Sequence, residues 1–342
     1  MKIALDATYS VGNNLSGVGV YSREMLYGLP SAHPEARFLY CFRPHRFLRG
    51  LRLPHARNVS RRLLIDHCPP GSADVFHGTN QRLPKGRLRR AASTFHDLFV
   101  LTGDYSTPEF RRRFAAQARD AAARSDLIIT VSGFTASQVE GLLGVERGRI
   151  RVIHHGVRSP APSNVPREPV ILHVGAIQAR KNIVRLIEAF ESTAPGWRLL
   201  LAGSAGFGVE EILHRIEASP RRESIEILGY VSATELPNLY QRASIFAFPS
   251  LDEGFGMPVL DAMAAGVPVV TSDRSALPEV AGDAALLVDP ASTQSIAEAI
   301  GRLTISEELR RDLIERGLRR AAQFTWEDAV RKTWLVYEEL LG

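Results

Sequence analysis

The stretch SIFAFPSLDEGFGMPVLDAMAAGVPVVTS, residues 244–272, contains two short apolar runs separated by a glycine-rich turn and a further apolar segment. Residues 244–250 predict a buried strand, and 268–272 predict a second strand. Between them, Gly254 and Gly256 permit a tight turn, and Pro258 suits the first position of a helix. A strand, a helix and a strand in this order favour parallel pairing, so the stretch predicts an α/β fold.

The same alternation extends over nearly the whole chain. Strands are expected at 2–7, 37–42, 74–78, 92–97, 126–132, 149–157, 170–177, 197–204 and 225–231, and helices at 20–29, 109–124, 182–193 and 209–218. A proline-rich segment, 158–169, is interpreted as a linker. We therefore expect two Rossmann-like, doubly wound domains, 1–160 and 161–325, facing a central cleft that binds a nucleotide or sugar nucleotide. The amphipathic tail, 326–342, is expected to pack back toward the first domain.

Composition narrows the cellular compartments and the kinds of membrane contact that the chain can have. The two cysteines, Cys41 and Cys68, have no metal-ligand or redox spacing, which favours a reducing cytoplasm. The start, MKIALDATYS, meets an acid at Asp6, so no signal peptide is expected. No run approaches the ~20 apolar residues of a membrane-spanning helix, so any membrane contact would be peripheral.

Charge is distributed unevenly along the chain. Residues 1–160 hold 24 of the 42 Lys and Arg but 12 of the 37 Asp and Glu, a balance of +12 against −7 for the remainder. This asymmetry predicts that the first domain meets an anionic partner, although a solvated basic surface has the same composition.

The glycine-rich turn has the chemistry of an anion site. Because a helix begins near Pro258, backbone N–H groups at its start are expected to point outward and favour a phosphate. These are the N–H groups of Phe255, Gly256, Met257 and Val259. Glu253 and Asp261 flank the turn and suit hydroxyl groups on either side of that phosphate. A plain strand-to-helix turn would show the same residues.

Polar groups recur in other loops. Arg180 and Lys181 lie just ahead of the helix at 182–193, where two cations suit a diphosphate. Gly17 and Gly19 form a second phosphate-type turn after the first strand, and His96 ends another strand, where it can contact a substrate. Alternatively, the two cations lie on solvent-exposed surface without a ligand, and the histidine has only a structural role.

Several motifs are missing. The sequence has no Asp-x-Asp pair and no His/Cys cluster with zinc spacing, so we expect no metal. It has no Gly-x-x-x-x-Gly-Lys-Ser/Thr phosphate loop and no Gly-x-Ser-x-Gly, which argues against an ATPase and a hydrolase. The charge of a leaving diphosphate would be offset by protein cations and helix N-termini.

Together these motifs resemble the retaining GT-B-fold glycosyltransferases of group 1 that carry a Glu-x7-Glu signature, and most closely their bacterial mannosyltransferase-like members. The resemblance covers essentially the whole chain. Besides the Gly17/Gly19 loop, it rests on DVFHGTN (74–80), FHDL (95–98), TVSGFTASQV (130–139), VIHHGV (152–157), VGAIQARKN (174–182), ILGYVSATELPNLYQRA (227–243), FPSLDEGFGMPVLDAMAAGVPVVTS (248–272) and LPEVAGDAALLVDP (277–290).

The resemblance implies a role for each matching residue. Glu253 would contact the transferred sugar and Asp261 the ribose, while Arg180 and Lys181 would stabilise the leaving diphosphate. His96 would hydrogen-bond the sugar. Backbone groups would bind the rest of the donor: Gly17, Gly19, Gly254, Phe255, Gly256 and Met257 at the sugar and phosphates, and Tyr230 and Val231 at the base.

Two positions depart from the family pattern. The second acid is Asp261 rather than Glu, one methylene shorter, so the nucleotide must sit closer or a water must bridge. Ala176 stands where some members carry an arginine after the glycine of the strand end. Arg180 and Lys181 would therefore be the cations that offset the charge of the diphosphate.

The resemblance implies transfer of a hexose, with mannose from GDP-mannose favoured, to a hydroxyl of a glycan or lipid-linked saccharide. UDP- and dTDP-sugars share the remaining motifs. No nucleic acid partner is expected, and the oligomeric state stays open. Arg111, Arg112 and Arg113, with Arg87, Arg89 and Arg90, would suit a lipid-diphosphate acceptor at the inner face of the cytoplasmic membrane. The alternatives are a nicotinamide dehydrogenase, a sugar-nucleotide epimerase and a nucleotide-sugar-binding protein without transfer.

Overall fold

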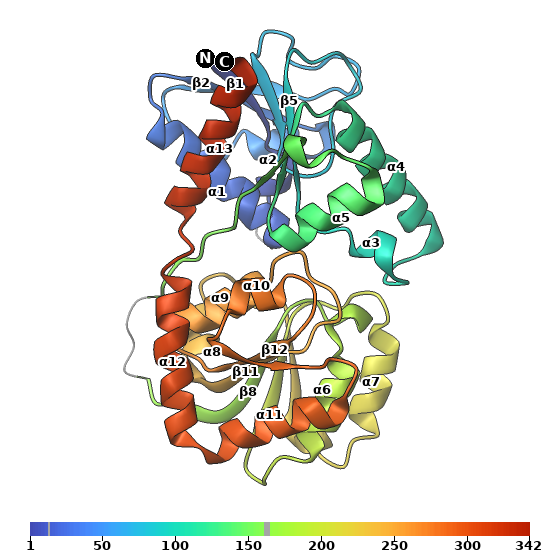
Figure 1. Cartoon of the computed structure of the whole chain (residues 1–342), viewed down its shortest axis with the longest axis vertical. Coiled ribbons are helices and arrows are strands. Elements are labelled where there is room, and N and C mark those ends of the chain that lie inside the picture. The colour runs from blue at the N-terminus through green and yellow to red at the C-terminus, as the bar shows by residue number, and fades with distance from the viewer. Residues whose placement is uncertain (13, 161–164) are drawn as a thin grey trace. The chain divides into compact units, whose positions relative to one another are not determined.

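The computed structural model describes residues 1–12, 14–160 and 165–342 (Figure 1). These residues form two compact units. Unit 1 comprises Met1–Gly103, Thr107–Gly156 and Thr325–Gly342, and unit 2 comprises Asp104–Ser106 and Val157–Phe324. Within the predicted linker 158–169, residues 161–164 lie outside the described residues. Its last two residues, Glu168 and Pro169, already belong to a strand, which corrects the predicted end of the linker.

The sheet of unit 1 is parallel throughout its described strands. They pair in the order β3-β2-β1-β4-β5-β6-β7. Their bounds are β1 Lys2–Asp6, β2 Arg37–Phe42, β3 Val59–Leu63, β4 Val75–Gly78, β5 Ala91–Phe95, β6 Leu127–Thr130 and β7 Ile150–Val152. The helices of this unit are α1 Gly17–Ala32, α2 Pro44–Gly50, α3 Phe99–Thr102, α4 Pro108–Arg124, α5 Gly133–Leu143 and α13 Trp326–Leu341, with 3₁₀ turns η1 Thr8–Ser10 and η2 Arg147–Arg149.

The sheet of unit 2 repeats this pattern. Its described strands are parallel and pair in the order β10-β9-β8-β11-β12-β13. Their bounds are β8 Glu168–Val174, β9 Arg198–Ala202, β10 Ile225–Gly229, β11 Ala243–Phe248, β12 Val269–Ser272 and β13 Ala285–Val288. The helices are α6 Ile183–Glu191, α7 Val209–Glu217, α8 Leu236–Arg242, α9 Met257–Ala264, α10 Leu277–Ala281, α11 Thr293–Ile305 and α12 Glu307–Ala321, with η3 Ala179–Lys181 and η4 Arg222–Ser224.

Both sheets are doubly wound, which confirms the predicted fold class. In each, strand order reverses beside the first strand of the unit: between β1 and β4, and between β8 and β11. In open parallel sheets a ligand binds outside the carboxyl ends of the strands at such a reversal, because the following loops diverge to opposite faces there. The loops after β8 and β11 are therefore where the chemistry of unit 2 is expected.

Each unit has its own apolar core. In unit 2, buried side chains of β8, β9 and β11 pack against α6, α7 and α11, including Ile171, Leu186, Phe190, Leu201 and Ile300. In unit 1, β1, β4, β5 and β6 pack against α4 and α5. No helix among the described residues is long and apolar enough to cross a bilayer.

Helix α13, at the end of the chain, packs on α1 of unit 1 (Figure 1). This confirms the packing predicted for the amphipathic tail. A Cβ at Gly28 of α1 would lie 2.4 Å from Cγ2 of Val330, so glycine permits the close approach of these helices. The ring of Trp334 stacks on His33 at 3.6 Å, and the Tyr337 hydroxyl bonds the buried His77 at 2.6 Å.

Some boundaries differ from the predicted ones. Strand β7 ends at Val152 rather than at 157, and α1 begins at Gly17 rather than at 20. The sequence pattern also missed β3 and β13, each of which is the outermost strand on one side of its sheet. Edge strands bury little surface, and VSRRL in β3 shows only weak apolar alternation, so periodicity carries little signal there.

Candidate active site

Three of the predicted side chains meet at the strand-order reversal of unit 2. Arg180 and Lys181 lie in η3, after β8, and Glu253 lies in the loop after the neighbouring strand β11. Lys181 Nζ donates a hydrogen bond to Oε1 of Glu253, and the Arg180 guanidinium lies 2.9 Å from the same oxygen. Ser250 adds a third contact, from its hydroxyl to Oε1 at 2.6 Å.

These contacts hold Glu253 as a carboxylate. Burial by itself would raise its pKa, but the charges of Arg180 and Lys181 and the hydrogen bonds from Lys181 and Ser250 lower the pKa to about 2. Both hydrogen bonds that described residues donate to this carboxylate fall on Oε1, and the nearest approach of Arg180 is to the same oxygen. Glu253 is thus anchored through Oε1, and its second oxygen accepts no hydrogen bond from the described residues.

Packing fixes both cations. The Lys181 side chain is 9% exposed and its ammonium lies 4.6 Å from the ring centroid of Phe248, the last residue of β11. Nη1 of Arg180 also donates to the carbonyl of Asp252. The loops are joined directly as well, because Leu251 N donates to the Arg180 carbonyl at 2.9 Å. The cations are therefore positioned before any ligand binds.

The turn between Glu253 and α9 is buried and needs glycine. Gly256 precedes α9 with φ of 103°, and a Cβ there would lie 2.7 Å from Leu277 Cδ2. Gly254 and Phe255 are buried in the turn, and Met257 is the first residue of α9. One expectation is corrected: the N–H of Val259 is not free, because it donates to the Gly256 carbonyl at 2.9 Å. The N–H groups of Gly256 and Met257 have no such acceptor among the described residues.

Asp261 lies within α9, near Tyr240. Burial raises the pKa of Asp261 to about 7, although the residue as a whole stays partly exposed. The same carboxylate adds to the effect of burial in raising the pKa of the Tyr240 phenol. No described residue donates a hydrogen bond to the Asp261 carboxylate, which suits an acceptor for ligand hydroxyl groups.

The remaining residues of unit 2 for which ligand contacts were predicted lie in the loop after β10. Tyr230 is 40% exposed there and Val231 follows it. Because β8, β10 and β11 are parallel members of one sheet, this loop emerges at the same edge as Lys181 and Glu253. The structure therefore brings the donor-site residues predicted in the second half of the chain to one edge of one sheet.

His96, Gly17 and Gly19 belong to unit 1. His96 follows β5, is 7% exposed, and bonds the Thr79 carbonyl through Nε2 at 2.9 Å. Burial lowers its pKa to about 4 despite that bond, so the ring is neutral near pH 7. Its other nitrogen lies 3.4 Å from Nε2 of His155. A neutral, hydrogen-bonded ring suits substrate positioning better than proton transfer.

Gly17 and Gly19 lie in the first turn of α1. Ser16 caps this helix, its hydroxyl accepting from the Gly19 N–H at 3.4 Å. A Cβ at Gly19 would lie 2.9 Å from the Tyr9 carbonyl oxygen, so glycine is required there by packing alone. Gly17 is exposed at the helix start.

Sequence reasoning missed Ser250, Phe248 and Ser275, which contact Glu253 or Lys181. Two serines and a phenylalanine at strand ends and in loops form no sequence motif that would indicate a functional site. Their role follows from the pairing of β8, β11 and β12, which brings the three loops together.

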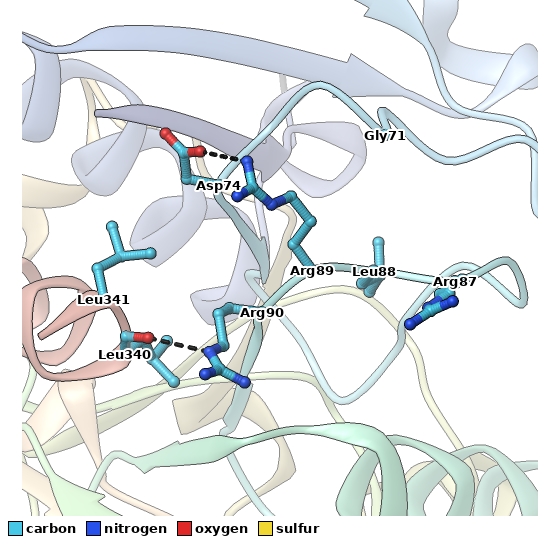
Figure 2. Close-up of a pocket in the computed structure, with 8 residues that line it drawn as sticks. All are labelled: Gly71, Asp74, Arg87, Leu88, Arg89, Arg90, Leu340 and Leu341. Carbon is cyan, nitrogen blue, oxygen red and sulfur yellow. Dashed lines mark hydrogen bonds and ion pairs between the residues drawn. The ribbon is translucent and has the colours of Figure 1, made fainter.

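A pocket lies elsewhere, at the amino edge of the sheet of unit 1 (Figure 2). It has a volume of about 630 Å³ and is lined by Gly71, Asp74, Arg87, Leu88, Arg89, Arg90, Leu340 and Leu341. Arg89 pairs with Asp74 at 2.9 Å, and Arg90 Nε donates to the Leu340 carbonyl at 3.1 Å (Figure 2). Arg87, Arg89 and Arg90 precede β5, whereas Arg111–Arg113 follow it, so the two predicted basic groups lie at opposite ends of that strand.

Within the described ranges, no group of three or more His, Cys, Asp or Glu side chains is arranged to hold a metal ion.

Two family models and a curated relative match the chain. Residues 17–159 match the family model "Glycosyltransferase Family 4", and 159–320 match "Glycosyl transferases group 1". The chain is 34% identical over 284 residues to the O-antigen chain mannosyltransferase B of Escherichia coli, covering 78% of this chain and 74% of that protein.

Two solved structures have the same fold. Sucrose-phosphate synthase from Thermosynechococcus elongatus superposes with a TM-score of 0.81 at 21% identity, over 100% of this chain and 99% of that one. Anabaena HepE in complex with UDP-glucose gives a TM-score of 0.75 at 18% identity, over 99% of this chain and 100% of that one. With two doubly wound Rossmann-like domains and these relatives, the chain belongs to the group 1 glycosyltransferases of the GT-B fold.

Proposed function

We propose that the protein is a retaining hexosyltransferase that moves mannose from GDP-mannose to a hydroxyl of a glycan or lipid-linked saccharide without a metal. The observation that carries the proposal is the anchored Glu253. Lys181, Arg180 and Ser250 contact one of its oxygens, and the other accepts no hydrogen bond from the described residues, at the strand reversal where ligands of this fold bind.

Arg180 and Lys181 are proposed to bind the diphosphate of the donor. Glu253 offsets their charges before the donor arrives, so they can be buried without an uncompensated charge. Each cation carries more than one N–H, so each can donate to a diphosphate as well as to Glu253. Because these groups are already in place, they can stabilise the charge that grows on the leaving phosphate without reorganising.

Glu253 is proposed to contact the transferred sugar through Oε2. With a pKa of about 2 it stays ionised at neutral pH and cannot act as a proton donor there. An anion near the anomeric carbon favours the positive charge that develops as the bond to the phosphate breaks. The electron pair of that bond leaves with the nucleoside diphosphate.

The acceptor hydroxyl is proposed to attack from the face that the diphosphate leaves, and its proton passes to a phosphate oxygen. This same-face route retains the configuration of the sugar and requires no protein nucleophile. The neutral His96 fits a hydrogen-bonding role rather than that of the base, since burial lowers its pKa to about 4. Contacts of His96, Gly17 and Gly19 with the donor remain predictions.

The nucleotide would be bound by backbone and carboxylate groups of unit 2. The N–H groups of Gly256 and Met257 at the start of α9 suit the distal phosphate. Asp261 suits the ribose hydroxyls, and the backbone at Tyr230 and Val231 suits the base.

The identity of the substrates is supported by relatives. The E. coli relative is named as an O-antigen chain mannosyltransferase, which favours a mannose donor and a saccharide acceptor. The HepE structure holds UDP-glucose, so uridine donors are the alternative to test. A lipid-linked acceptor would bring the protein to the inner face of the cytoplasmic membrane. Exposed basic residues at the start of α4, together with Phe110, would suit that contact.

The test is a panel of GDP-, UDP- and dTDP-sugars, followed by thermal shift and by release of nucleoside diphosphate with a saccharide acceptor. We expect GDP-mannose to give the largest shift and acceptor-dependent release of GDP. A larger response to a UDP-sugar would refute the GDP-mannose assignment but not hexosyl transfer. If no sugar nucleotide stabilised the protein at millimolar concentration, the transferase proposal would fail.

A further inference from the structure

The backbone around Glu253 is held by a residue in an unfavourable conformation. Ser275, in the loop between β12 and α10, has φ of 57°. Left-handed backbone of this kind is uncommon for residues other than glycine and persists only where the surroundings impose it. Among the described residues, only Asn182 shares this property, with φ of 60°. Asn182 directly follows Lys181, so both exceptions lie beside the Lys181–Glu253 pair.

Ser275 and the residue after it bind both sides of Glu253. The Glu253 N–H donates to the Ser275 hydroxyl at 3.1 Å. The Ala276 N–H donates to the Glu253 carbonyl at 3.2 Å. The left-handed turn at Ser275 lets its own side chain and the next N–H face the same residue. The loop after β12 thus fixes the backbone from which the Glu253 side chain extends.

The other neighbouring loop fixes the side chain. Arg180 and Lys181, which follow β8, bind Oε1 of Glu253. Strand β11 lies between β8 and β12 in the sheet, so Glu253 is held from both sides. The β8 side supplies the charges, and the β12 side supplies hydrogen bonds to the backbone.

We propose that Ser275 is a positioning residue: its left-handed backbone and its hydroxyl hold the Glu253 backbone so that Oε2 meets the sugar of the donor. This inference rests on the proposed transfer reaction. The contact is with the Glu253 backbone alone, so Ser275 is expected to affect turnover through Glu253 and to affect the binding of the nucleotide much less.

Two substitutions separate the strain from the hydrogen bond. S275G relieves the strain and removes the hydroxyl, whereas S275A keeps a Cβ in the left-handed conformation and removes the same hydroxyl. We expect S275G to melt at a higher temperature than S275A. We expect both to lower kcat to a similar extent, by about 10-fold or more, the scale of a small misplacement of a reacting group. The KM for the donor should change by less than about 3-fold.

Arg274 provides a matched control on the same loop. Its side chain is 52% exposed and pairs with Asp289 at 2.6 Å. R274A is expected to keep kcat within about 2-fold of the wild type.

A double-mutant cycle tests whether Ser275 acts through Glu253. If it does, adding S275G to E253Q should lower kcat by less than about 2-fold, because the side chain being positioned is already impaired. A full additional loss of about 10-fold would show that Ser275 acts by another route and would overturn the proposal.

Amide hydrogen exchange of Glu253 provides a readout that needs no substrate. We expect faster exchange at this N–H in S275G and S275A, and no change in R274A. Unaltered exchange would overturn the proposed contact whatever the activity of the variants. Faster exchange with wild-type kcat would overturn the positioning role. An inactive wild type would instead refute the transfer reaction, and exchange would still decide whether Ser275 holds Glu253.

Discussion

Glu253→Gln removes the charge at the centre of the candidate site and keeps the shape of the side chain. The surroundings lower the pKa of Glu253 from 4.5 to about 2. That difference corresponds to a preference of about 3 kcal/mol for the ionised over the neutral carboxyl group. Glutamine resembles the neutral form and leaves Arg180 and Lys181 buried without their counter-charge. We therefore expect E253Q to lose about 3 kcal/mol of stability, and its Tm to fall by roughly 5–10 °C.

The pH dependence of this loss has a definite sign. A carboxyl group with a lowered pKa stabilises the fold above its unfolded pKa, and the stabilisation disappears as pH falls through the folded value. The difference in Tm between wild type and E253Q should thus be full at pH 7 and shrink between about pH 4.5 and pH 2. A difference in Tm that grew on acidification would contradict the assigned charge state.

Activity and stability can be separated with a second substitution. E253Q is expected to lower kcat by about 10²-fold or more, the scale of one lost contact in the transition state. Adding K181M removes one of the two uncompensated cations, so the double variant should regain part of the lost Tm but none of the lost kcat. The assays are thermal denaturation and release of nucleoside diphosphate. Wild-type kcat and Tm in E253Q would refute the reasoning.

Further predictions concern Asp261, Arg167 and independence from a metal. Burial raises the pKa of Asp261 to about 7, so its ionised form is disfavoured in the folded protein. D261N should therefore raise Tm more at pH 8, where Asp261 is ionised, than at pH 4. An equal gain in Tm at both pH values would contradict the raised pKa. If Asp261 binds the ribose, the donor KM should rise as pH falls below about 7 in the wild type and stay flat in D261N. Arg167 donates to the carbonyls of Ala243 at 2.6 Å and Gly266 at 2.8 Å, just after α8 and α9. R167A should lower Tm and leave kcat unchanged. The loss in the free energy of unfolding should be about 1 kcal/mol, because the side chain is exposed. Transfer should persist in chelator, and complete loss that is restored by a divalent cation would refute metal independence.

Much of the fold was predictable from local pattern. Runs such as KIALDA and SIFAFPS are apolar, short and bounded by turns, as buried parallel strands are. Glu253, Lys181 and Gly256 could be named because each stands at a strand end or helix start, where a parallel α/β sheet places its ligand-binding loops. The edge strands β3 and β13 were not predicted, because VSRRL contains only two apolar residues and ALLV is only four residues long.

The sequence by itself determined two alternating α/β halves, the carboxyl edge of the second sheet as the place of chemistry, and the residue types found there. Only the tertiary structure decided how these residues share their contacts. The pairing of β8, β11 and β12 brings together loops that are distant in the chain, since the partners Lys181 and Glu253 are 72 positions apart. As a result, Lys181 and Ser250 bind one oxygen of Glu253 and Ser275 holds its backbone. Such contacts depend on strand order and on the path of each loop. Neither has a periodic signature, because both are set by packing between segments distant in the chain.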